Sequence, residues 1–248
     1  MKKKSKTDKS FFLARAGFII ALAAVLSALV AAFCTRYGLW KFTTGITVFR
    51  CAAYAAVAGS ALSLIGLVAS LRIVIQRGFF LAFLGLLIGG TVGATALYWR
   101  HVADSVPPIH DITTDTQDPP KFDEILRLLK SADNSPVYGG KKVAAQQKRS
   151  YPEIVPLILR IPPGQAFDRA LSTARSLGWQ IIDDDKSAGR IEAVATTFWF
   201  GFRDDIVVRV RPEDAGSRVD IRSESRVGVS DLGKNAERIR KFLTAMKE

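Results

Sequence analysis

The chain has 248 residues, of which 48% are hydrophobic, and it carries 35 Lys and Arg residues against 23 Asp and Glu residues. Two cysteines and ten prolines are too few for a disulfide-stapled miniprotein or a collagen, and the apolar content excludes a disordered chain. Residues 1–105 hold 12 of the basic residues and two of the acidic ones, so the net charge of +12 belongs almost wholly to this part. The remainder is close to neutral, which argues against nucleic acid as a partner.

Three apolar stretches fill the first hundred residues, at 11–33, 51–71 and 78–99. Each is long enough to cross a hydrocarbon core about 30 Å thick as a helix, the conformation that pairs every backbone group in lipid. A cleaved signal peptide is the alternative for the first stretch, because Lys2–Lys9 is basic and small residues follow at Ala31 and Ala32. Two further spans favour a permanent anchor, and we predict a membrane domain over residues 1–104.

The distribution of basic residues predicts the orientation of the anchor. Five lysines precede the first span, and Arg72 and Arg77 lie in the second loop, whereas only Arg100 follows the third span. Arg36 and Lys41 in the first loop reduce the difference in positive charge between the two sides of the membrane. Cytoplasmic loops carry the excess of positive charge, so we expect a bacterial inner-membrane protein with a cytoplasmic N-terminus and a periplasmic C-terminal domain.

The third span carries Gly85, Gly89 and Gly93 on one helix face. Small residues let two helices approach closely, and we expect this row to pack against another span of the same chain, with a homo-oligomer as the alternative. No ionisable residue lies in the middle of a span, which favours an anchor in the lipid bilayer over an ion pathway. Cys34 and Cys51 are expected to be free thiols rather than a disulfide.

Residues 105–248 predict an α+β domain with an antiparallel sheet and helices on one face, in the order strand, helix, four strands, helix. Alternation and turn residues place the strands at 155–161, 179–182, 190–200, 206–211 and 218–225. Helical spacing places helices at 167–177 and 232–246, the latter capped by Ser230. A short helix is expected after an Asp118 cap, and residues 134–150 are interpreted as a long polar loop.

Charged and aromatic residues occur in these strands and in the turns between them. We expect six charged residues to lie on the solvated face of the sheet: Arg209, Arg211, Arg218, Asp220, Arg222 and Glu224. Asp183–Asp185 and Asp204-Asp205 are interpreted as solvated turn acids. The aromatic run Phe198–Phe202 is expected to pack into the core on one face, while a helix, the bilayer surface or an apolar ligand covers the other.

The most unusual string runs Ile109-His110-Asp111-Ile112-Thr113-Thr114-Asp115 and continues after two residues with Asp118-Pro119-Pro120-Lys121-Phe122. Together with Phe198–Asp205 and Arg222–Arg226, it resembles the domain-of-unknown-function family numbered fourteen-ninety-nine. The resemblance covers residues 105–247. It implies a membrane-attached envelope domain and brings no activity, substrate or catalytic residue with it.

Four residues of this string, His110, Asp111, Thr114 and Asp115, are candidate binding residues. Local turn bonds are the simplest role for such side chains. Zinc is disfavoured because the only other histidine is His101, and calcium because the ligand spacing of an EF-hand is missing. A Ser/His/Asp triad stays open, although no Gly-x-Ser-x-Gly elbow occurs.

We therefore assign no catalytic residue, metal or cofactor from the sequence. The interpretation is a non-enzymatic, membrane-anchored module that binds an envelope protein or a lipid. The alternative is a metal-dependent or acid/base enzyme that uses His110 with Asp111 or Asp115.

Overall fold

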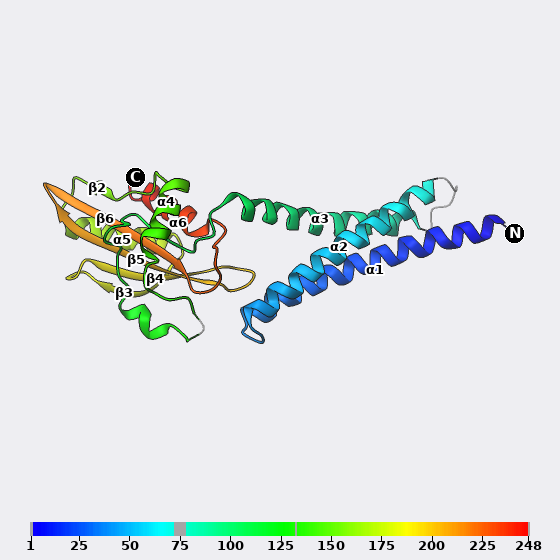
Figure 1. Ribbon diagram of the computed structural model, residues 1–248, viewed down its shortest axis with the longest axis horizontal. Helices are drawn as coiled ribbons and strands as arrows, with labels where there is room; N and C mark the ends of the chain where they lie inside the picture. Colours follow the sequence, from blue (N-terminus) through cyan, green and yellow to red (C-terminus); the bar gives the residue numbers. More distant parts are fainter. Residues whose placement is uncertain (1, 72–77, 132, 248) are drawn as a thin grey trace. The chain divides into compact units, whose positions relative to one another are not determined.

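The computed structural model describes residues 2–71, 78–131 and 133–247 of the chain. Arg72 and Arg77, on which part of the predicted orientation depends, lie outside the described residues. The chain forms two compact units (Figure 1). The first is Met1–His101 together with Trp199–Gly201, and the second is Val102–Phe198 together with Phe202–Glu248.

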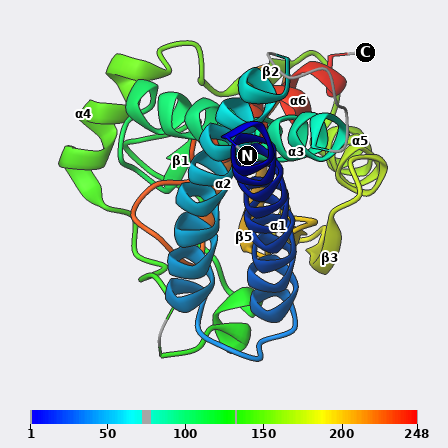
Figure 2. The same cartoon turned by 90° about the vertical axis from the view of Figure 1, so that its right-hand side faces the viewer.

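The first unit consists mainly of three long helices, α1 (Lys2–Arg36), α2 (Phe42–Leu71) and α3 (Phe79–Ser105). Each contains a segment of 27 to 29 residues that is long and apolar enough to cross a membrane. α1 and α2 run side by side along most of their length (Figure 2). α1 extends beyond its apolar stretch at both ends, α2 at its start and α3 at its end. A helix can continue into the polar interface, where water and headgroups satisfy its last backbone groups.

Small residues let these helices approach one another. A Cβ atom added to Gly89 of α3 would lie 2.5 Å from Ser60 Oγ and 2.7 Å from the carbonyl oxygen of Ala56, both on α2. A Cβ atom on Gly85 would collide with Ser63 Oγ, whereas one on Gly90 would meet no atom within 4 Å. The glycine face of α3 therefore contacts α2 within one chain, while its neighbouring position points into open space.

The second unit combines ten elements, listed here in chain order: β1 (Asp111–Thr113), the 3-10 helix η1 (Glu124–Leu128), α4 (Gly140–Ser150), β2 (Leu157–Leu159), α5 (Pro163–Ser176), β3 (Gln180–Asp185), β4 (Arg190–Thr196), β5 (Arg203–Glu213), β6 (Gly216–Ser225) and α6 (Lys234–Ala245). The strands form one antiparallel sheet in the order β1-β6-β5-β4-β3, and β2 pairs with the far end of β6. The register of β3 against β4 shifts between Ile181 and Asp183. The α+β class and the order strand, helix, four strands, helix are confirmed for β2 to α6.

The main core lies between the sheet and helices α5 and α6. On this face, alternate residues of the central strands, such as Ile206, Val208 and Ile221, are buried against Phe242 and Ile239 of α6. Each such side chain contributes about 1.5–3 kcal/mol by leaving water. This face is the part of the domain that hydrophobic periodicity predicts well.

Helices α5 and α6 lie on one face of the sheet, as predicted, and the opposite face is also covered, by η1 and the segment before it. Val194 and Val207 pack there against Phe122 and Ile125, which belong to η1 and the segment before it. The buried Glu192 carboxylate joins the two layers, because it accepts hydrogen bonds from the Asp123 N–H (2.6 Å) and the Ile125 N–H (2.7 Å). It thereby satisfies amide groups at the start of η1 that no side chain of that helix caps.

Four local expectations are corrected. Residues 140–150 form helix α4 rather than a loop, because Lys, Ala, Gln and Arg are strong helix formers. Asp118 caps no helix, since its carboxylate binds Arg209 and Arg211. Asp231, not Ser230, accepts hydrogen bonds from amide groups at the start of α6. β4 ends at Thr196, so the aromatic run lies in a loop, where Phe198 and Trp199 are exposed rather than packed in the core.

Candidate functional site

The string that begins at His110 forms edge strand β1, which pairs with β6 so that Asp111 lies opposite Glu224. Asp111 and Arg222 of β6 are both buried and form a bidentate ion pair. Arg222 donates from Nε to Asp111 Oδ1 (2.9 Å) and from Nη2 to Asp111 Oδ2 (2.8 Å). The Phe122 ring centroid lies 4.8 Å from the Arg222 guanidinium, which adds a cation–π contact. Asp111 thus anchors the string to the centre of the sheet.

Arg222 serves two buried carboxylates, because its Nη2 also donates to Glu224 Oε2 (3.0 Å). Burial and the negative charge of Asp111 raise the pKa of Glu224 to about 8, despite the positive charge of Arg222. Burial, with the charge of Asp111, also raises the pKa of Tyr138. The raised pKa favours the protonated, neutral form of Glu224 in this buried cluster.

The threonines of the string extend the sheet with side chains as well as backbone. The Ile221 N–H donates to Thr114 Oγ1 (2.9 Å), and the Thr114 N–H donates back to the carbonyl oxygen of Ile221 (2.9 Å). On the outer edge of β1, the Thr113 N–H donates to Oε1 of Gln147 (3.0 Å), whose Nε2 donates to the Thr113 carbonyl (2.6 Å). Gln147 belongs to α4. A side chain of this helix thus satisfies the backbone groups of Thr113 at the outer edge of β1.

Asp115 turns the chain and binds an arginine. Its Oδ1 accepts hydrogen bonds from the N–H groups of Gln117 and Asp118, and Arg218 Nη2 donates to its Oδ2 (2.7 Å). Burial opposes the charged form, but these amide bonds and the positive charges of Arg218 and Arg209 outweigh it and lower the pKa of Asp115. A carboxylate held in this way is stable as an anion.

Asp220 of β6 is the centre of a larger ionic cluster. Its side chain is fully buried, and it accepts hydrogen bonds from Arg209, Arg211 and Arg218. Arg209 and Arg211 also bind Asp118, which connects the cluster to the string. The predicted solvated face of β5 and β6 is therefore wrong for its central residues, because residues 111–131 and 133–138 cover them.

His110 takes part mainly through its backbone. Its carbonyl oxygen accepts hydrogen bonds from the Ser225 N–H (2.9 Å) and from Asn235 Nδ2 (2.8 Å) of α6, and its side chain is half-buried. The four candidate residues thus lie along one edge of the sheet, but Asp111, Thr114 and Asp115 are each bound to a different residue of β6. Across residues 2–71, 78–131 and 133–247, no three His, Cys, Asp or Glu side chains converge to hold a metal ion.

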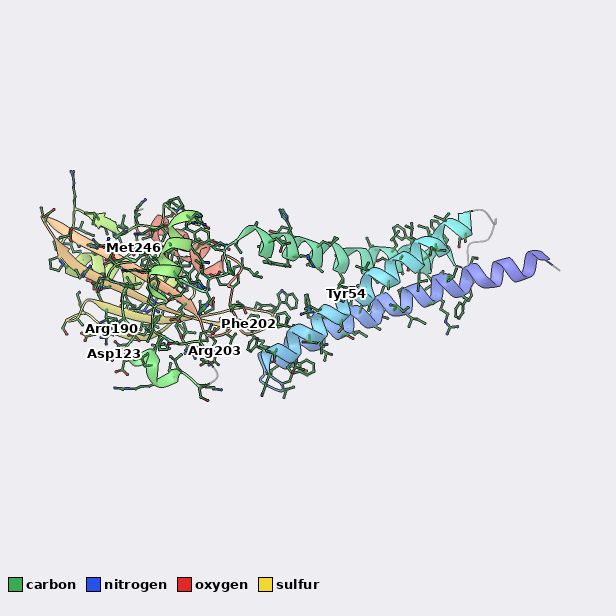
Figure 3. The ribbon with its side chains drawn as sticks, viewed as in Figure 1. Tyr54, Asp123, Arg190, Phe202, Arg203 and Met246 are labelled. Atoms are coloured by element: carbon green, nitrogen blue, oxygen red, sulfur yellow. The ribbon has the colours of Figure 1, made fainter. Side chains whose placement is uncertain are left out.

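A groove of about 320 Å³ opens beside the ionic cluster, on the face opposite α5 and α6. Its lining residues are Asp118, Pro120, Lys121, Ala188, Arg190, Val207 and Arg209. Arg190 and Arg209 lie directly opposite each other on β4 and β5. Arg190 also binds Asp123 (3.0 Å), and Figure 3 labels these two residues at this face. The lining thus contains three cations, one carboxylate and three apolar residues.

A family model described as protein of unknown function (DUF1499) matches residues 111–246, more than half of the chain. The chain belongs to the DUF1499 family. A comparison with curated proteins finds no match. The match begins at Asp111, the residue that binds Arg222, and it covers both the string and the strand to which the string is bound.

Two further ion pairs of the DUF1499 domain were missed, because Asp204 and Asp205 were expected in a solvated turn. Both lie in β5 and are buried. Arg226 donates from Nε and Nη2 to Asp205, and Arg238 of α6 binds Asp204 on the other face of the sheet. The partner arginines lie 21 and 34 residues further along the chain, so no local sequence signal reveals these pairs.

The raised pKa of Glu224 predicts that the stability of the DUF1499 domain decreases with pH. Glu224 is protonated in both states below the unfolded pKa of about 4.5. Above it the unfolded chain loses the proton while the folded domain keeps it, so the stabilising contribution is lost progressively as the pH rises to about 8.

Melting temperatures of the full chain between pH 5 and pH 8.5 would measure this effect. Glu224→Gln is neutral throughout, so it should flatten the decrease and raise the melting temperature at the alkaline end. A variant with the same slope as the natural chain would contradict this account of Glu224.

Proposed function

We propose that this protein is a multi-pass protein of the bacterial inner membrane that holds its DUF1499 domain in the periplasm, and that the domain works by binding a partner rather than by catalysis. The proposal rests on one observation: three polar side chains of the string already bind residues of the sheet and so help to hold the fold together. Asp111 is bound to Arg222, Thr114 to Ile221, and Asp115 to Arg218. A general base needs a pKa near the working pH, and the lowered pKa of Asp115 does not meet that need.

The groove beside the ionic cluster is the binding site in this proposal. Lys121, Arg190 and Arg209 supply positive charge around Pro120 and Val207. Guanidinium groups recognise phosphate and carboxylate oxygens through paired N–H donors. We infer that the partner presents an anionic group at this groove, either the phosphate of a lipid or a carboxylate of an envelope protein.

The orientation has a direct test. Single cysteines at Ser5 and Ser135, in a chain whose Cys34 and Cys51 are replaced, should react differently with an impermeant thiol reagent in intact cells. We expect residue 135 to be labelled and residue 5 to be labelled only after the membrane is opened. Labelling of residue 5 in intact cells would overturn the orientation.

The binding function is tested with Lys121→Glu, which reverses an exposed charge of the groove. This variant should lose the ability to complement the envelope phenotype of a deletion strain while its melting temperature stays unchanged. Lys142→Glu, an equally exposed change on α4, is the matched control and should complement fully. A photoreactive residue at position 121 distinguishes the two sources of the anion, since it would crosslink either to lipid or to protein.

The catalytic alternative makes the opposite prediction for the string. His110→Ala should retain function if the domain only binds, whereas Asp115→Ala should lose stability and function together because it releases Arg218. Loss of function in His110→Ala at an unchanged melting temperature would overturn the binding proposal in favour of an acid/base enzyme.

A further inference from the structure

The loop between β4 and β5 consists almost wholly of aromatic residues. Phe198, Trp199, Phe200 and Gly201 form the loop, and Phe202 follows directly. Phe198 and Trp199 are 68% and 54% exposed. Turns are normally built from Gly, Asn, Asp, Ser and Pro, so the turn itself does not require large rings at these positions. Exposed apolar residues that lie together mark an interaction surface.

Hydrogen bonds that do not involve the rings order the backbone at the base of this loop. The Thr197 N–H donates to the carbonyl oxygen of Phe202 (2.8 Å), and the Phe202 N–H donates to Thr197 Oγ1 (2.9 Å). Gly201 adopts a positive φ of 66°, which a residue without a side chain does readily. Figure 3 labels Phe202 and Arg203 at the base of the loop. Substitution of the two exposed rings should therefore leave the hairpin intact.

The composition of the loop matches a lipid surface. Aromatic rings are enriched where headgroups meet hydrocarbon, and the exposed Arg203 next to the loop suits anionic headgroups. The same chain carries three helices able to span a membrane, and residues Trp199–Gly201 belong to the compact unit that contains those helices. Because the domain is tethered to the bilayer, the effective concentration of lipid near the loop is high. Even a loop with weak affinity for lipid would therefore be bound.

We propose that the aromatic loop, residues 198–202, inserts into the lipid–water interface of the membrane that anchors the chain. The loop is then a membrane contact in addition to the three helices. This inference does not depend on the ligand of the groove.

The test uses the full chain in nanodiscs of phosphatidylcholine and phosphatidylglycerol. Phe198→Cys and Trp199→Cys, in a background with Cys34 and Cys51 replaced, carry an environment-sensitive fluorophore. Ala215→Cys is the matched control, since this exposed residue lies in the turn at the other end of β5, about 36 Å along the strand. Quenching by doxyl-labelled lipid and by aqueous iodide is then compared.

We expect doxyl-labelled lipid to cause a loss of emission at positions 198 and 199 but not at 215, and iodide to do the reverse. Iodide quenching that is equal at all three positions would overturn the proposal, because the loop would then be in water. Protection of position 199 from both quenchers would overturn it as well, since protein rather than lipid would cover the loop. Unchanged melting temperatures of the labelled variants show that the domain is folded in each case.

Discussion

Arg222→Met should destabilise the DUF1499 domain by about 3–5 kcal/mol, because it removes the guanidinium that binds both Asp111 and Glu224 and leaves a buried carboxylate without its partner. For a domain of this size the loss corresponds to a decrease of about 10 °C in melting temperature. Thermal unfolding of the full chain, followed by tryptophan fluorescence, measures it. Trp179 reports on the main core, where its ring stacks on Phe242 at 5.4 Å.

Two companion variants make the result specific. Arg175→Met removes an arginine whose side chain is 60% exposed and pairs with Asp184 at the surface, so it should cost less than about 1 kcal/mol. Adding Asp111→Asn to Arg222→Met should recover part of the loss, since it removes the buried carboxylate that Arg222→Met leaves without its partner. Similar losses in Arg222→Met and Arg175→Met would contradict the description of a buried pair.

Gly89→Leu should greatly reduce the amount of folded protein in the membrane, whereas Gly90→Leu should leave it almost unchanged. The leucine at position 89 would have to displace α2, where Ser60 and Ala56 already lie within 2.7 Å of an added Cβ atom. Overpacking of this kind typically costs about 1–3 kcal/mol. At position 90 the same side chain would enter open space.

Membrane fractions with quantitative immunoblotting measure the retained protein, and size-exclusion chromatography in detergent measures its oligomeric size. Because the contact lies within one chain, Gly89→Leu should reduce the amount without changing the size. A change in size alone would instead indicate that the glycine row joins two chains. Equal tolerance of Gly89→Leu and Gly90→Leu would exclude a close contact at this row.

The parts of the fold that follow from repeated patterns could be predicted. Uncharged stretches of about 20 residues identify membrane helices because the thickness of the bilayer fixes their length. The main core follows from alternation in strands such as β5, where Ile206 and Val208 point to one face, and from the apolar stripe of α6. Both signals are local, so one sequence is enough to read them.

The covered ionic face could not be predicted by the same reasoning. Alternating charges along β6 are typical of a strand that faces water, and Asp220, Arg222 and Glu224 fit that pattern although they are buried. Their cover is an irregular segment that has no period, and it is held by ion pairs between residues about a hundred positions apart, such as Asp111 with Arg222. The candidate residues of the string could be selected from the sequence, but their partners required the three-dimensional structure.

The two edges of the sheet have a consequence for how this domain behaves in a crowded compartment. An unpaired strand edge can recruit another chain and start aggregation, and proteins avoid this with charges, irregular pairing or a covering element. Gln147 of α4 occupies the hydrogen-bonding groups of Thr113 on one edge. On the other, β3 combines the register shift after Ile181 with the consecutive acids Asp183–Asp185. Two copies that paired through β3 would bring six carboxylates together. The addition of strands from another chain is therefore opposed at both edges of the sheet. Copies held at high density on a membrane can thus stay separate.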